Sequence, residues 1–82
     1  MKVKVKYFAM LREEVGLSEE LVEVAAAAPT VAEVRQACAQ LHGEAFEKVR
    51  RIRAAVDGVM AADDVVVPEG AETAFFPPVT GG

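Results

Sequence analysis

A single well-marked helix in the middle of the chain is the feature that most restricts the fold. Thr30 and Glu33 fit a capping box, in which each side chain satisfies an otherwise unpaired backbone N–H at the start of a helix. Four apolar residues follow at spacings of three and four and mark one face: Val31, Val34, Cys38 and Leu41. Gly43 is suited to end this helix in a left-handed conformation. Any fold for this chain must therefore bury this one apolar face.

The segments on both sides of the helix have the patterns of strands. Residues 2–8 alternate strictly, with Val3, Val5 and Tyr7 on one face and lysines on the other. Further strands are predicted at 20–25, 52–56, 59–60 and 72–76, and short helical pieces at 9–16 and 44–51. Asp57-Gly58 is a strong signal for a tight turn between two strands. These strands supply the sheet that the helix needs.

The predicted order is β-β-α-β-β, with the first two strands close enough to form an antiparallel hairpin. A mixed sheet packed on one main helix is the natural α+β solution for this order. The first and last strands then lie side by side at the centre of the sheet. This is the β-grasp, or ubiquitin-like, layout.

Length and composition place the chain among small folded domains. It has 82 residues, of which 52% are hydrophobic, and a formal net charge of −4, which argues against general nucleic-acid binding. We expect one β-grasp domain over residues 1–76 and an extended tail over 77–82. Cys38 is the one cysteine, so no internal disulfide forms. The N-terminal alternation is unlike a signal peptide and no apolar run is long enough to span a membrane, so we expect a cytoplasmic protein.

The last six residues differ from ordinary strand or helix sequence. Pro77-Pro78 follows an aromatic strand end, and proline supplies no N–H to a sheet and favours extended geometry. Val79 and Thr80 then lead to Gly81-Gly82, which leave the α-carboxylate unobstructed for entry into a narrow channel. This carboxylate is the only group that the tail offers to chemistry. A loose, frayed terminus is the simpler reading, but it does not require two prolines after two phenylalanines.

The body of the chain offers no competing active site. His42 is the only histidine and falls near a helix C-terminus, where its charge favours the helix dipole. Cys38 belongs to an apolar helix face and is expected to be buried and inert. The acidic pairs Glu13-Glu14, Glu19-Glu20 and Asp63-Asp64 have no third ligand at a metal-binding spacing. Neither a metal nor a tightly bound cofactor is expected.

Exposed aromatic residues are predicted on the outer face of the sheet. Strand alternation puts Phe8 on the lysine side, and the adjacent Phe75 and Phe76 must point to opposite faces. If the first and last strands are neighbours, these aromatics form one patch near the exit of the tail, and Met60 can join it. Exposed aromatics rimmed by charge are typical of a partner interface. The alternative is that the helical turn around Met10 and Leu11 covers Phe8.

At this point the residues resemble the small-subunit family of molybdopterin synthase. The most specific segment is 74–82, which contains Phe-Phe-Pro-Pro and ends in Gly-Gly. Residues 5–13, 54–58 and Thr30-Val31 also match, so the resemblance spans nearly the whole chain. The segment 65–72 departs from the family pattern, which has a more acidic turn there. The resemblance implies a β-grasp sulfur carrier in which Phe8, Met60 and Phe76 match an apolar docking surface and Arg12 matches a basic position near it.

The resemblance also implies the chemistry of the tail. In such families an ATP-dependent, ubiquitin-activating-like enzyme adenylates the terminal carboxylate, here that of Gly82, and a sulfur donor displaces AMP to leave a thiocarboxylate. The tail, Pro77 to Gly82, then enters the large subunit of the synthase, which supplies the catalytic side chains, and sulfur passes to cyclic pyranopterin monophosphate. The small subunit is thus a non-catalytic sulfur donor in a heterotetramer, and ATP serves only the activating enzyme.

Two other functions fit the same tail. A carrier of the thiamine pathway uses the same fold and tail chemistry with a different acceptor, although its tails lack the Phe-Phe-Pro-Pro run. A ubiquitin-like modifier joins Gly82 to lysines of other proteins instead of carrying sulfur. A third class, a binding module that uses only the aromatic patch, does not need a free carboxylate at Gly82.

Overall fold

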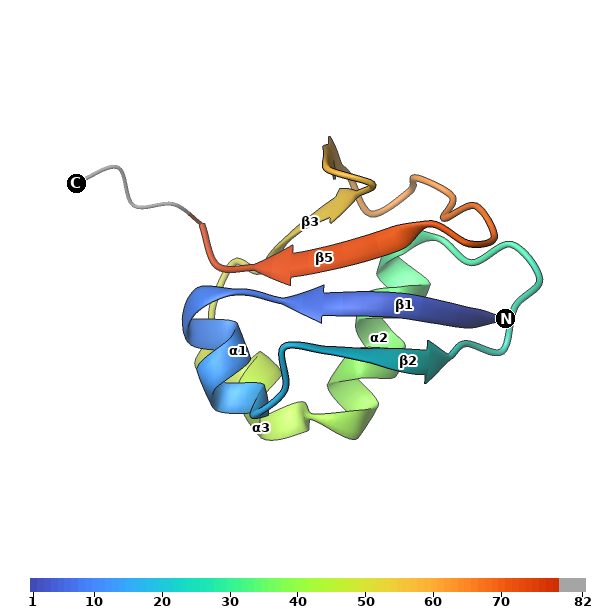
Figure 1. Ribbon diagram of the computed structural model, residues 1–82. Coiled ribbons are helices and arrows are strands. Elements are labelled where there is room, and N and C mark those ends of the chain that lie inside the picture. Colours follow the sequence, from blue (N-terminus) through green and yellow to red (C-terminus); the bar gives the residue numbers. More distant parts are fainter. Residues whose placement is uncertain (79–82) are drawn as a thin grey trace.

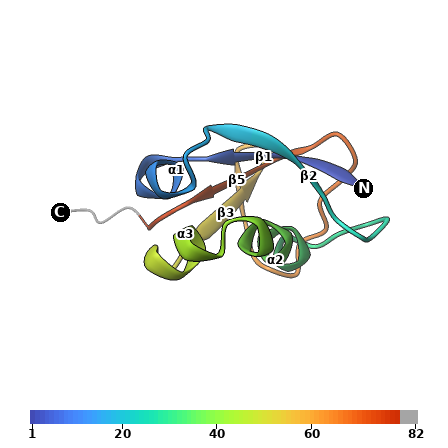
Figure 2. The ribbon, with the colours of Figure 1, turned by 90° about the horizontal axis from the view of Figure 1, so that it is seen from below.

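A five-stranded mixed sheet carries two of the helices on one of its faces and the third at one end (Figures 1 and 2). The computed structural model describes residues 1–78. The strands are β1 (Lys2–Tyr7), β2 (Glu19–Glu23), β3 (Arg53–Val56), β4 (Val59–Ala61) and β5 (Glu72–Phe76), and the helices are α1 (Ala9–Val15), α2 (Val31–Leu41) and α3 (Gly43–Lys48). Figure 2 shows α2 and α3 under the sheet and α1 at the end where β1 and β5 finish.

The first and last strands are neighbours at the centre of the sheet. The strand order is β2-β1-β5-β3-β4, and β1 pairs parallel with β5 while β2 and β3 flank them antiparallel. This order and the helix packed across the sheet confirm the predicted β-grasp fold. On β1, Val3, Val5 and Tyr7 are buried as the alternation predicts. The lysines face outward, where Lys4 and Lys6 each lie 3.5 Å from a carboxylate oxygen of Glu72.

The α2 helix begins as predicted but ends differently. Thr30 accepts a hydrogen bond from the Glu33 N–H and the Glu33 carboxylate accepts one from the Thr30 N–H, so the capping box is present. Leu41, predicted to be buried, is 59% exposed. The next residue, His42, turns toward the sheet instead and caps the helix with φ −132°. Gly43 is therefore not a left-handed helix end, because it is already the first residue of α3.

The tight turns follow the residues that the sequence marks for them. Gly16 ends α1 in the left-handed region, with φ 87°. Asp57 and Gly58 both have positive φ, 48° and 82°, as the two-residue hairpin between β3 and β4 requires. The Asp57 carboxylate also accepts a hydrogen bond from the Glu72 N–H at 2.9 Å, which ties this hairpin to β5. The helical piece predicted at 44–51 is shorter and spans Gly43–Lys48.

The core is built from small apolar units around two large rings. Valine and alanine supply most of it, and Tyr7 and Phe75 are its largest fully buried side chains. Phe46 of α3 lies edge-on to both rings, with centroid distances of 6.3 Å to Tyr7 and 6.1 Å to Phe75. These contacts fix α3 against the two central strands.

Candidate functional site: the outer patch and the tail root

The outer face of the sheet carries three exposed or partly exposed apolar side chains, Phe8, Met60 and Phe76, which we call the outer patch. Strand register puts them on one face. Phe76 alternates with the fully buried Phe75, and Met60 pairs with Ala55, which pairs with Ala74 on the same face as Phe76. Phe8 follows directly after β1, and its N–H donates to the Phe75 carbonyl at 3.1 Å. The predicted placement of the three residues on one face is confirmed.

The α1 helix does not cover the outer patch. Leu11 points into the core and is fully buried, whereas Met10 is 57% exposed and Phe8 43% exposed. The alternative in which Met10 and Leu11 cover Phe8 is therefore wrong. Arg12, one helical turn after Phe8, is exposed, and its N–H donates to the Phe8 carbonyl at 3.3 Å. This backbone bond belongs to the first turn of α1, and the assignment of the Arg12 side chain to the docking surface stays a prediction.

Pro77 and Pro78 form what we call the tail root, the segment directly after β5. Both are partly buried, and they line an open groove of about 600 Å³ together with residues of α1, the last residue of α3 and the two residues after it: Ala9, Met10, Lys48, Val49 and Arg50. The chain thus leaves the sheet beside α1 (Figure 1). The predictions for Val79, Thr80, Gly81 and Gly82 lie outside the described residues.

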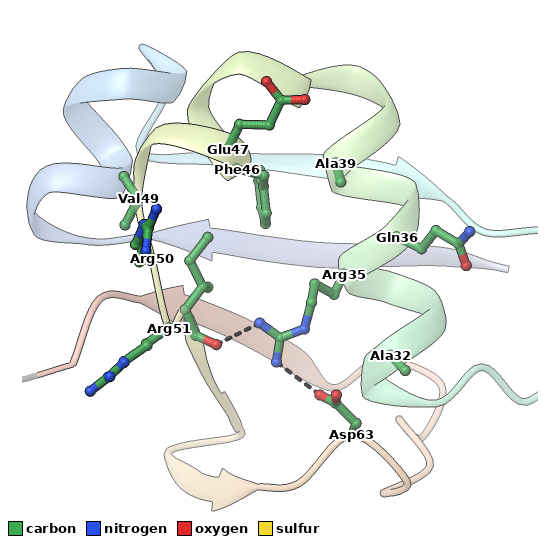
Figure 3. Close-up of a pocket in the computed structure, with 11 residues that line it drawn as sticks. Ala32, Arg35, Gln36, Ala39, Phe46, Glu47, Val49, Arg50, Arg51 and Asp63 are labelled. Carbon is green, nitrogen blue, oxygen red and sulfur yellow. Dashed lines mark hydrogen bonds and ion pairs between the residues drawn. The ribbon is translucent and has the colours of Figure 1, made fainter.

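Arg35 of α2 links the segments at the tail end of the sheet (Figure 3). Its guanidinium donates to the Ile52 carbonyl at 2.5 Å and to the Asp63 carboxylate at 2.9 Å. The same group lies 5.5 Å from the centroid of the Phe75 ring, within the range of a cation–π contact. One side chain thus ties the segment before β3, the loop after β4 and the strand that leads to the tail.

The hollow beside Arg35 has no constellation for catalysis. It measures about 600 Å³ and is lined mainly by alanines, Phe46 and arginines, with Glu47 and Asp63 as its acidic members. Figure 3 shows Arg51 pointing outward, away from Arg35. Within residues 1–78, no group of three or more His, Cys, Asp or Glu side chains is placed to hold a metal ion. In the same range, no helix has the length and apolar character to cross a membrane.

The sequence matches the model of the ThiS family over residues 5–82. The chain belongs to the ThiS family. The matched range includes the three residues of the outer patch, the tail root and the residues up to Gly82.

Individual relatives narrow the comparison within the ThiS family. The chain is 42% identical to the molybdopterin synthase sulfur carrier subunit of Escherichia coli strain K12, over 98% of this chain and 99% of that protein. Its fold matches the crystal structure of SAMP1 from Haloferax volcanii with a TM-score of 0.86 and 29% identity, over 100% of both chains. The same fold occurs in the complex of subunits 1 and 2 of the molybdopterin-converting factor from Helicobacter pylori, with a TM-score of 0.66, 20% identity and 100% coverage of both chains.

This ThiS-family chain also has a partly buried polar cluster that the sequence did not reveal. Glu20 Oε2 accepts the Tyr7 hydroxyl at 2.7 Å and lies 2.6 Å from His42 Nε2. The hairpin register brings Glu20 opposite Val5, on the inner face of β2, which is why it meets Tyr7. His42 does cap a helix, but its side chain pairs with Glu20, a partner that the dipole argument did not predict.

Cys38 is a core residue, as predicted. It is fully buried, and burial raises the pKa of its thiol to about 11. Burial likewise raises the pKa of Tyr7 far above its usual value. Both groups stay neutral at physiological pH, so neither is an activated nucleophile. The outer patch and the tail root therefore remain the best candidate site.

Proposed function

We propose that this chain is the sulfur-carrier small subunit of a molybdopterin synthase. The observation that supports this most is the 42% identity to the Escherichia coli sulfur carrier subunit over nearly the full length of both proteins. The geometry is compatible with a carrier, because the chain leaves β5 through two prolines next to an exposed apolar patch. A partner that grips the outer patch would thereby direct the tail into its own active site.

The proposed reaction uses the Gly82 carboxylate. An ATP-dependent adenylating enzyme joins this carboxylate to AMP and releases pyrophosphate, which turns a poor acyl donor into a good one. A sulfur donor then displaces AMP, and the carboxylate becomes a thiocarboxylate. Two loaded tails in succession supply the two sulfurs of the dithiolene made from cyclic pyranopterin monophosphate. No side chain described here has to act as acid, base or nucleophile.

The proposed main partner is the large subunit of the synthase, which supplies the catalytic side chains. The names of two similar proteins describe subunits, one of molybdopterin synthase and one in a complex of subunits 1 and 2. An apolar patch rimmed by lysines and arginines is suited to such a stable contact. We assign Phe8, Met60 and Phe76 to this interface, with Arg12 at its rim.

Intact mass spectrometry of the protein from its native cell tests the proposal. Replacement of one oxygen by sulfur at the C-terminus is the expected result. Deletion of Gly82, or addition of one residue after it, should abolish sulfur transfer, while circular dichroism stays that of the folded domain. Normal sulfur transfer in either variant would contradict the thiocarboxylate mechanism.

A protein-modifier role is the second candidate. The similarity in fold to SAMP1, a small archaeal modifier protein, favours it, because a modifier uses the same free carboxylate. In that case the cell extract should contain adducts in which Gly82 is joined to lysines of other proteins. The same mass-spectrometric experiment therefore separates the two functions. A thiamine-pathway carrier would instead acquire the same sulfur but fail to support molybdopterin formation.

A further inference from the structure

A group of exposed arginines lies in the segment next to the tail root. The chain is acidic overall, with a formal net charge of −4, yet residues 48–53 contain four of its nine Lys and Arg side chains. Lys48 lies near Glu14 and Glu44. Among the described residues, Arg50, Arg51 and Arg53 have no ion pair or side-chain hydrogen bond, and all three are exposed. We call these three residues the arginine rim.

Two members of the arginine rim lie next to the departing chain. Arg53 is the register partner of Phe76, so it flanks the outer patch. Arg50 lines the groove at the tail root together with Pro77 and Pro78. The rim therefore borders the path that the tail takes out of the sheet.

The segment that carries the rim is held in place by other contacts. Val49 donates to the Ala45 carbonyl at 3.0 Å, and Arg35 holds the Ile52 carbonyl from α2 (Figure 3). Arg51 between them has φ 55°, a left-handed conformation that costs a non-glycine residue about 1 kcal/mol or more. The backbone of this segment is therefore held in place, while the exposed arginine side chains can adjust to a partner.

The groove below the rim adds an apolar component. Its walls come from Ala9, Met10, Val49, Pro77 and Pro78, and Lys48 and Arg50 stand at its edge. An apolar side chain flanked by carboxylates complements this surface in both shape and charge. An acidic chain would otherwise repel an acidic partner, so the local rim is what makes such a contact favourable.

We propose that the arginine rim and the tail-root groove form a second docking surface, which meets the outer patch at Arg53, for an acidic segment of the adenylating enzyme. This inference rests on the proposed function, because it assigns the surface to the loading step. Charge complementarity speeds encounter more than it strengthens a complex, which suits a partner that must release the loaded tail. The apolar outer patch suits the longer contact with the large subunit.

The occupant is a protein segment rather than the nucleotide. A tail that enters a narrow channel is extended, so the four residues after Pro78 carry the Gly82 carboxylate about 13 Å away from the tail root. The reacting phosphate is then out of reach of Arg50. The rim acts on the body of the enzyme and not on the reacting atoms.

The test is stopped-flow association of the full chain with purified adenylating enzyme at low and high salt. Arg50→Glu should lower the association rate about tenfold at low ionic strength. The difference should nearly vanish near 1 M salt, where charges are screened over about 3 Å. The matched control is Lys2→Glu, which makes the same change in net charge at an exposed, unpaired lysine at the opposite end of β1 (Figure 1). This variant should change the rate by less than about twofold.

The apolar half of the surface and the choice of partner are tested in parallel. Met10→Ser should speed dissociation from the adenylating enzyme, and Arg50→Glu should leave the affinity for the large subunit within about twofold. Equal effects of Arg50→Glu and Lys2→Glu, a salt-independent difference, or a loss confined to the large subunit would each overturn the inference. Loading of the wild-type chain is followed by intact mass. If the wild-type chain gains sulfur while Arg50→Glu binds the adenylating enzyme normally, the assignment of the docking surface is wrong and the proposed function stands.

Discussion

Replacing Phe75 and Phe76 one at a time tests whether Phe75 stabilises the core and Phe76 contacts the large subunit. Phe75 is fully buried, packs edge-on against Phe46 and lies under the Arg35 guanidinium. Phe75→Ala should therefore cost about 3–5 kcal/mol for the lost burial and the cavity. The lost cation–π contact should add about 0.5–1 kcal/mol. For a domain of this size, such a loss lowers the melting temperature by about 15 °C or more.

Phe76→Ala removes a side chain of the same size from the other face of the same strand. Because Phe76 is less buried than Phe75, we expect the free energy of unfolding to fall by a smaller amount, about 1–2 kcal/mol. The affinity of the Phe76→Ala variant for the large subunit should instead drop at least about tenfold, as expected when an aromatic anchor of an interface is removed. Phe75→Leu is a useful control, since it keeps part of the buried volume and should cost about 1–2 kcal/mol.

The assay is urea denaturation followed by far-UV circular dichroism, with the binding of each folded variant measured by calorimetry. If Phe76→Ala destabilises the domain as much as Phe75→Ala does, the assignment of faces is wrong. If it leaves the affinity unchanged, the outer patch is not the large-subunit interface. The stability measurement tests the assignment of faces and the affinity measurement tests the interface, so either assignment can be rejected without the other.

Two further predictions concern the polar and ionisable groups of the core. Burial raises the pKa of Cys38 to about 11, above the value of about 8.5 for an exposed thiol, so the unfolded chain loses this proton first. Stability should therefore be complete below about pH 8.5 and fall by about 2–3 kcal/mol as the pH rises to 11. Cys38→Ala should flatten this decline in urea titrations at several pH values, and an equally steep decline would contradict the assignment. Glu20→Ala leaves the Tyr7 hydroxyl and His42 without their shared acceptor and should cost about 1–3 kcal/mol at pH 7 in the same assay. A loss below about 0.5 kcal/mol would mean that water replaces the carboxylate.

Local signals in the sequence were enough to predict most of the fold. The capping box at Thr30 and Glu33, the Asp57-Gly58 turn and the alternation of residues 2–8 each depend on neighbours within a few positions, and all three are present. Strand parity also predicted that Phe75 and Phe76 lie on opposite faces, which is confirmed, while the choice of Phe76 as the outward residue came from the family resemblance. Such features are fixed by the local chain and need no knowledge of distant contacts.

The misjudged features depend on distant contacts. Leu41 fits the apolar spacing of its helix, but His42 occupies the space facing the sheet because Glu20 and Tyr7 offer it a polar partner there. The role of Arg35 was equally hidden, since its partners Ile52 and Asp63 are brought together only by the folded sheet. Pairings over 17 or more residues cannot be read from spacing along one helix.

The parallel pairing of β1 with β5 has a consequence for synthesis of the protein. Lys4 pairs with Glu72, so the first strand to leave the ribosome waits for nearly the whole chain before its central neighbour exists. Until residues 72–76 have emerged, Val5 and Tyr7 lack one flank of the core, and the sheet has an open central edge. Contacts this far apart in sequence form late in folding. The same strand, β5, thus completes the core through Phe75 and carries Phe76 of the outer patch, so the patch is complete only once the core is.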